Sequence, residues 1–189
     1  MKTVSFTTMA DGTKEDYELL DQYFDTHLTT MADRLLEALN ALQSSLAGYQ
    51  VTRYEHSLQS ATRAFQDDRD EEYVVTALLH DIGDELAPLT HGEMMGAILR
   101  PYVRPELVWI AKHHGVFQTY YYAHHSGGDR NMRNRFKDNP WFDACAEFCE
   151  KYDQNCFDPA FESLPVEFFA PIVRRVISEP RYLTGSEAI

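Results

Sequence analysis

The sequence predicts an all-α protein, and three observations support this class. Apolar residues recur at spacings of three and four along most of the chain, which is the period of an amphipathic helix. No segment alternates apolar and polar residues as a half-buried strand would. Proline and glycine fall at the ends of the periodic segments, where they start or stop helices. With 189 residues, 44 % of them apolar, the chain can bury a full-sized core.

The first periodic segment runs from about residue 14 to residue 46 and predicts one long helix or a pair of helices. Its apolar stripe consists of Leu20, Phe24, Leu28, Met31, Leu35, Leu39, Leu42 and Leu46. Gly48 interrupts the pattern. We therefore expect residues 1–47 to form an N-terminal helical extension packed on the core, and residues 48–189 to form the main domain as a single structural unit.

Seven further helical segments are predicted along the rest of the chain, at about residues 53–65, 71–82, 91–99, 105–114, 141–153, 164–169 and 171–178. The segment 71–82 is apolar on most sides, which is typical of a central, buried helix. Pro105 and Pro140 suit the starts of the helices that follow them. Residues 115–139 are rich in Tyr, Gly, Asn and Arg, and we expect them to be irregular.

Charge and hydropathy narrow the possible partners. The formal net charge is −13, and such an acidic surface repels phosphate backbones, so nucleic acid is not an expected partner. No apolar run is long enough to span a bilayer, and the first twenty residues lack the apolar core of a signal peptide. We expect a soluble, cytoplasmic protein with no membrane partner and no obligate protein partner, which acts on a small molecule.

The three cysteines are Cys145, Cys149 and Cys156, an odd number that does not favour a disulfide framework in a chain of this kind. Cys145 and Cys149 lie four residues apart on a predicted helix and could share a metal ion. They lack a second pair of ligands, so buried apolar thiols are the favoured interpretation.

The pair His80-Asp81 ends the apolar helix at 71–82 and is the main indication of chemistry. Burying an ionised carboxylate beside an imidazole is costly unless both are paired or bind a metal. Adjacent residues of a helix point about 100° apart, so the two side chains can serve two ions and a carboxylate can bridge both. Imidazole and carboxylate ligands together suit iron, manganese or zinc.

Further candidate ligands flank this pair, and the full order is His56, His80, Asp81, His91, His114 and Asp153. Taken singly, each has a structural explanation. A His-Asp pair is common by chance, His91 could simply begin a helix, His113 and His114 could lie at the surface, and Asp153 could be one more acidic charge. The joint order, with each residue on a predicted helix that has an apolar flank, favours a metal site.

This order, H…HD…H…H…D, resembles that of the HD-domain superfamily. More narrowly, it is similar to the branch that contains myo-inositol oxygenase and the organophosphonate oxygenases. The matching strings lie within residues 54–153, about half of the chain: YEHSLQSA at 54–61, ALLHDIGD at 77–84, LTHGEMMGAIL at 89–99, AKHHGVFQTYY at 111–121 and CEKYD at 149–153.

The resemblance implies an HD-domain helical bundle that holds a mixed-valent Fe(II)/Fe(III) pair and uses O2 as co-substrate. By this resemblance, one iron would be bound by His56, His80 and Asp153, and the other by His91 and His114, with Asp81 as the bridge. In the same way, His114 and not its neighbour His113 is the expected ligand. Catalysis would rest on Asp81, His56 and His114.

The implied reaction is the O2-dependent cleavage of the C–P bond of a 1-hydroxyphosphonate. The expected substrate is (R)-1-hydroxy-2-(trimethylammonio)ethylphosphonate, which would give glycine betaine and phosphate. Two alternatives stay open. One is a metal-dependent HD phosphohydrolase that acts on a small phosphorylated metabolite, and the other is a non-catalytic HD module. Asp84 stands where phosphohydrolases commonly carry a lysine, and its charge would suit a cationic substrate group unless it is merely solvated.

The candidate substrate-binding residues are Asp84, Lys151, Tyr49, Gln59, Gln118, Ser126 and Tyr120. Lys151 could pair with the phosphonate, with Arg130, Arg133 and Arg135 as other choices or a solvated lysine as the alternative. Tyr49 could shield the iron, and Gln59 could hydrogen-bond a group on the metal. Tyr120 belongs to an aromatic cluster, with Phe117, Tyr121 and Tyr122, that could hold a quaternary ammonium by cation–π attraction or simply pack in the core.

Overall fold

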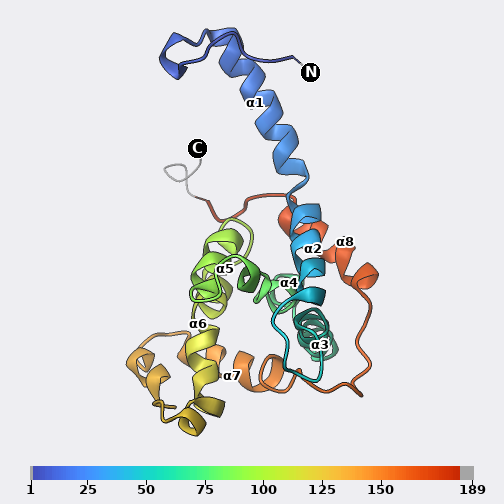
Figure 1. Ribbon diagram of the computed structural model, residues 1–189, viewed down its shortest axis with the longest axis vertical. Helices are drawn as coiled ribbons and strands as arrows, with labels where there is room; N and C mark the ends of the chain where they lie inside the picture. The colour runs from blue at the N-terminus through green and yellow to red at the C-terminus, as the bar shows by residue number, and fades with distance from the viewer. Residues whose placement is uncertain (1, 184–189) are drawn as a thin grey trace.

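The computed structural model describes residues 2–183, and in this part of the chain all regular secondary structure is helical, without a strand (Figure 1). This confirms the predicted all-α class. The α-helices are α1 (Lys14–Thr29), α2 (Met31–Ala41), α3 (Arg53–Gln66), α4 (Glu71–Leu79), α5 (His91–Leu99), α6 (Pro105–Tyr122), α7 (Phe142–Tyr152) and α8 (Val166–Ile177). Among the described residues, no helix is both long and apolar enough to cross a membrane.

Helix α4 lies at the centre of the bundle, as its apolar composition predicted. Every residue from Tyr73 to Leu79 is buried, and α3, α6 and α8 pack around the helix. Asp70 caps its N-terminus by accepting a hydrogen bond of 3.0 Å from the backbone N–H of Tyr73. Because α4 is held on all sides, the residues that follow its last turn, His80 and Asp81, have a fixed position in the interior.

The first periodic segment is a pair of helices that differ in burial. In α2, Leu35 and Leu39 are buried against the bundle. In α1, Leu20 and Phe24 are 37 % and 49 % exposed, and the helix projects away from the rest of the protein (Figure 1). Among the described residues, α2 thus packs on the core and the apolar stripe of α1 is largely exposed, while the division of the chain after residue 47 stays a prediction.

Helix α6 is longer than predicted and continues through Gly115 to Tyr122, into the segment expected to be irregular. The reason is tertiary packing. Phe117 is fully buried and contacts Phe142, with ring centroids 5.1 Å apart. Burial of an aromatic side chain outweighs the low helix propensity of Gly115, which costs about 1 kcal/mol relative to alanine. Two short 3-10 helices, Ala123–Ser126 and Met132–Phe136, follow.

Helix α8 joins two segments that were predicted as separate helices, and Pro171 lies inside it. A proline at this position removes the hydrogen bond to the carbonyl of Glu167. Both residues are exposed, so water can satisfy that carbonyl. The buried face, which includes Phe169, Ile172 and Val173, keeps the helix continuous across the proline.

Helices α5 and α6 approach closely at Gly92. A Cβ atom at this position would lie 2.5 Å from the backbone oxygen of Lys112, so any side chain larger than hydrogen would push the helices apart. Because Gly92 directly follows His91, this close approach brings the start of α5 within reach of His114 on α6. Glycine at position 92 therefore allows the close approach of α5 and α6 that brings His91 and His114 together.

Cys145, Cys149 and Cys156 are all buried as free thiols, which agrees with the favoured interpretation of their pattern. Cys149 packs behind the site, with Sγ 3.5 Å from the backbone oxygen of His114. Burial raises the pKa of the Cys149 thiol, so the neutral form is favoured in this apolar surrounding.

Candidate metal centre

The first group of candidate ligands comes from three elements. His56 lies in the first half of α3, His80 follows α4, and Asp153 follows α7. The Nε2 atoms of His56 and His80 are 3.3 Å apart. Oδ1 of Asp153 lies 3.4 Å from the first of these atoms and 3.7 Å from the second. All three side chains are at most 3 % exposed, so this half of the site is the more deeply buried one.

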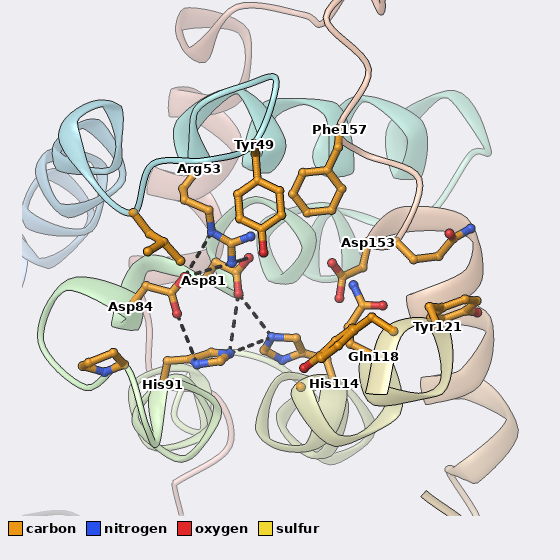
Figure 2. A pocket seen from close by; sticks show the side chains of 15 residues that line it. Tyr49, Arg53, Asp81, Asp84, His91, His114, Gln118, Tyr121, Asp153 and Phe157 are labelled. Carbon is orange, nitrogen blue, oxygen red and sulfur yellow. Dashed lines mark hydrogen bonds and ion pairs between the residues drawn. The ribbon is translucent and has the colours of Figure 1, made fainter. Parts of the chain in front are cut away.

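The second group consists of His91, the first residue of α5, and His114 on α6. Their Nε2 atoms are 3.1 Å apart, and the two rings face the same space (Figure 2). The side chain of His114 is 2 % exposed, whereas that of His91 is 23 % exposed. This half of the site is therefore the more open one.

Asp81 lies between the two groups, and each of its carboxylate oxygens faces one of them. Oδ2 is 3.2 Å from Nε2 of His56 and 3.1 Å from Nε2 of His80. Oδ1 is 3.2 Å from Nε2 of His114 and 3.7 Å from Nε2 of His91. The structure thus brings all six predicted ligands together, in the order of a bridged pair. That they bind metal stays a prediction.

The outer nitrogen of each histidine ring is held by a hydrogen-bond acceptor, which orients the inner nitrogen. The distances from Nδ1 are 3.0 Å for His56 to Cys156 O, 2.8 Å for His80 to Ala77 O, 2.7 Å for His114 to Ala111 O and 3.2 Å for His91 to Asp84 Oδ1. Since a carbonyl oxygen only accepts, Nδ1 carries the proton, and in the neutral ring Nε2 presents a lone pair to the cluster.

The chemistry of this donor set fits a pair of metal ions. Lone pairs on the inner nitrogens and carboxylate oxygens converge at 3.1–3.7 Å, where they repel one another unless a cation or a proton lies between them. Two ligand atoms about 2.1 Å from one ion lie about 3.0–3.4 Å apart at tetrahedral or octahedral angles. In addition, Oδ2 of Asp153 is buried without a hydrogen-bond partner among the described residues, which an ion would supply.

Without an ion, a proton on His80 would relieve the repulsion between these lone pairs. Burial lowers the pKa of His80, but the adjacent carboxylates of Asp81 and Asp153 more than offset this and raise it to about 10. Because that value lies above the ordinary pKa of about 6.5, the charged ring stabilises the metal-free fold fully below pH 6.5. This stabilisation is lost as the pH rises through about 10.

Metal binding is therefore expected to release at least one proton from the site at pH 7 to 9, since a ligating histidine must be neutral. The affinity for a divalent ion such as Zn²⁺ should rise with pH up to about 10, where His80 loses its proton. Calorimetric titration in two buffers of different ionisation enthalpy measures the proton count. Equal heats in both buffers would show that His80 is already neutral in the metal-free protein.

A cavity of about 430 Å³ opens over the cluster (Figure 2). Its wall includes four of the six predicted ligands, namely Asp81, His91, His114 and Asp153. It also includes the aromatic side chains of Tyr49, Tyr121, Tyr122 and Phe157. The site is thus reached from a space of the size that a small molecule needs.

Of the predicted substrate-binding residues, Tyr49, Asp84 and Gln118 line this cavity. Asp84 is not free to meet a cationic group, since Oδ2 accepts hydrogen bonds from Arg53 and Oδ1 lies 3.2 Å from Nδ1 of His91. Its predicted charge pairing with the substrate is corrected on this ground, because both oxygens are engaged within the protein.

The other predicted substrate-binding residues lie outside the cavity and have partners of their own. Lys151 is exposed and pairs with Glu147 at 2.7 Å. The Gln59 amide donates to the backbone oxygen of Asp158 at 2.7 Å and not to a metal-binding group. The Ser126 hydroxyl donates to the backbone oxygen of its own turn.

Tyr120 is also occupied, because its ring is covered by two cations of the same chain. The guanidinium carbons of Arg130 and Arg133 lie 4.2 and 3.8 Å from the ring centroid. Phe117, another member of the predicted aromatic cluster, is fully buried. Only Tyr121 and Tyr122 of that cluster face the cavity.

Two residues of the site were not predicted from the sequence. Arg53 lines the cavity and contacts Asp84, with Nη2 at 2.8 Å and Nε at 3.1 Å from Oδ2. Its position three residues before His56, on the same face of α3, was a usable signal. Phe157 stacks on His56 with ring centroids 4.4 Å apart, and Tyr49 stacks on Phe157 in turn. Phe157 lies in an irregular segment, where periodicity gives no signal.

Compared with known protein families, the chain matches no family model, and compared with curated proteins it matches none. The class of the protein therefore rests on its fold and on the geometry of the site. It is an all-helical protein whose interior holds a cluster of histidine and aspartate side chains that could bind metal.

Proposed function

We propose that this protein is an HD-domain diiron oxygenase that cleaves the C–P bond of a 1-hydroxyphosphonate with O2. The observation that carries the proposal is the position of Asp81, whose two oxygens each face a separate pair of histidine Nε2 atoms. A carboxylate shared in this way can bridge two ions and fix the distance between them. The order of the ligands along the chain, which resembles that of the oxygenase branch, supports iron as the metal.

The iron pair, when bound, supplies the electron transfers that O2 needs before it can react with an organic substrate. The residues of the chain fix its surroundings. His56, His80 and Asp153 form the more deeply buried side of the site, whereas His91 faces the cavity. Tyr49 and Phe157 stack over His56 and keep that part of the wall apolar.

The proposed substrate is (R)-1-hydroxy-2-(trimethylammonio)ethylphosphonate, and the proposed location is the cytoplasm. The cavity offers aromatic faces at Tyr49, Tyr121, Tyr122 and Phe157, which attract a quaternary ammonium by about 1–2 kcal/mol when it is desolvated. The reaction balances without an external reductant. One substrate and one O2 give glycine betaine, hydrogen phosphate and one proton, while the C1–P and C1–H bonds break and C–O and P–O bonds form.

A metal-dependent HD phosphohydrolase is the second candidate, and one observation favours keeping it. Asp84 stands where such enzymes carry a lysine, but Arg53 places a cation in the same cavity. Arg53 could therefore bind a phosphate group in place of that lysine, which keeps hydrolysis as a candidate function.

Dependence on O2 separates the two functions. The iron-loaded protein is incubated with the trimethylammonio hydroxyphosphonate in air and under anaerobic conditions, and phosphate and glycine betaine are quantified. We expect both products in equal amounts in air and neither without O2. Phosphate release under anaerobic conditions, from this compound or from phosphate monoesters, would instead identify a hydrolase.

A further inference from the structure

Arg53 is held firmly at the edge of the metal site. Its side chain is 11 % exposed, and one edge of its guanidinium group contacts two carboxylates. Nη2 and Nε donate to Oδ2 of Asp84 at 2.8 and 3.1 Å, and Nη2 also pairs with Oδ2 of Asp81. An arginine fixed in this way has lost its conformational freedom before any ligand arrives, which lowers the entropic cost of binding.

One nitrogen of the guanidinium group, Nη1, is available. Among the described residues, Nη1 of Arg53 has no hydrogen-bond partner, although Arg53 lines the cavity over the metal ligands (Figure 2). Both N–H groups of Nη2 are engaged by the two aspartates, so the two N–H groups of Nη1 are left to donate to the oxygens of a carboxylate, phosphate or phosphonate. The free N–H groups thus face the space that a substrate would occupy.

The charges around the cavity favour an anion there once ions are bound. Asp81, Asp84 and Asp153 contribute three negative charges, and Arg53 contributes one positive charge, so the metal-free wall carries two negative charges. The proposed Fe(II)/Fe(III) pair would reverse this to three positive charges, with the histidines neutral. Arg53 would then lie near cations with no anion to meet its free nitrogen. A dianionic ligand would reduce the net charge to one positive charge.

We infer that Arg53 is the residue that binds the anionic end of the substrate, with Asp84 as the positioning residue that holds it. The ligand class is a tetrahedral oxyanion with two negative charges, such as a phosphonate or phosphate group. This inference rests on the proposed function for the choice of a phosphonate. The aromatic end of the cavity, which includes Tyr121, is left for the uncharged or cationic end of the same molecule.

Lys151 provides a matched control, because it is a cation that the sequence predicted to bind the phosphonate. It lies in the last turn of α7, the helix that Asp153 follows, but it lies outside the cavity, is 49 % exposed and pairs with Glu147. Replacing either cation with glutamine removes one positive charge from the protein. Only the change at Arg53 removes a donor that faces the cavity.

The test measures binding of inorganic phosphate to the metal-loaded protein by calorimetry, with metal content determined by mass spectrometry. Arg53→Gln is expected to keep both ions and to weaken phosphate binding by about 10- to 100-fold, the effect of losing charge-assisted hydrogen bonds. Arg53→Lys keeps the charge but not the planar guanidinium group, and its phosphate affinity should lie between those of the wild type and Arg53→Gln. Lys151→Gln should bind phosphate as the wild type does.

Two outcomes would overturn the inference. One is a metal-loaded Arg53→Gln variant that binds phosphate with the affinity of the wild type. The other is loss of the ions from both Arg53→Gln and Arg53→Lys, since Arg53 would then act by holding Asp81. Neither measurement involves O2 or turnover. A protein that binds phosphate through Arg53 but fails to cleave the hydroxyphosphonate would sink the proposed reaction and leave the anion site standing.

Discussion

Replacing Asp81 with alanine is expected to abolish binding of both metal ions and reduce activity to the background rate. The reason is that Asp81 is the one predicted ligand whose carboxylate faces both histidine pairs. Its removal also leaves Arg53 with one carboxylate partner fewer. Metal analysis of the purified variant measures the loss, and Mössbauer or EPR spectroscopy of the wild type tests for a coupled Fe(II)/Fe(III) pair.

The matched control is His91→Ala, which removes a ligand of the second group alone. We expect this variant to keep one ion, held by His56, His80 and Asp153 with Asp81. A spectrum of uncoupled iron would accompany it. Retention of two ions by Asp81→Ala would show that the carboxylate does not bridge, and the six residues would then have to be divided differently.

Replacing Leu39 with alanine is expected to lower the free energy of unfolding by about 2–5 kcal/mol, as for other large-to-small changes in a core. Leu39 is fully buried in α2, at the contact of this helix with the bundle. Leu20→Ala, the same chemical change on the same apolar stripe, should alter stability by no more than about 0.5 kcal/mol, because Leu20 lies on the projecting helix α1. Denaturation with urea measures the free energy of unfolding of both variants.

A large effect of Leu20→Ala would mean that α1 is covered in solution. The two explanations for such a result are separable, since cover by a second molecule makes the unfolding midpoint depend on protein concentration. A midpoint that does not move with concentration would show instead that α1 folds back on its own bundle. Only the second result would contradict the projecting position of this helix, since a second molecule can cover α1 where it projects.

The candidate metal ligands were more predictable from the sequence than the other residues that line the cavity. Ligands must be of a few residue types, and burial of His80 and Asp81 behind an apolar helix could be read directly from the pattern. The helix periodicity likewise placed α4 at the centre, since an element that is apolar on all sides has few other positions.

The remaining features depend on contacts between segments that are distant in the sequence. Phe157 reaches His56 across about one hundred residues, and no local pattern records such a contact. The continuation of α6 beyond Gly115 results from the burial of Phe117, which overrides local propensity. For Asp84, the sequence showed the charge but not the partners that neutralise it, and Arg53 was one of them.

The hydrogen bonds that orient the four histidines imply that the two halves of the centre differ in how easily mutation can adjust them. His56, His80 and His114 are anchored by main-chain oxygens, which no codon change deletes. His91 is anchored by the Asp84 side chain, so a single base substitution that gives asparagine would change the basicity of this ring. In the proposed diiron centre, such a change would alter the reduction potential of the ion bound by His91 and His114, while the main-chain hydrogen bonds of the other histidines stay in place.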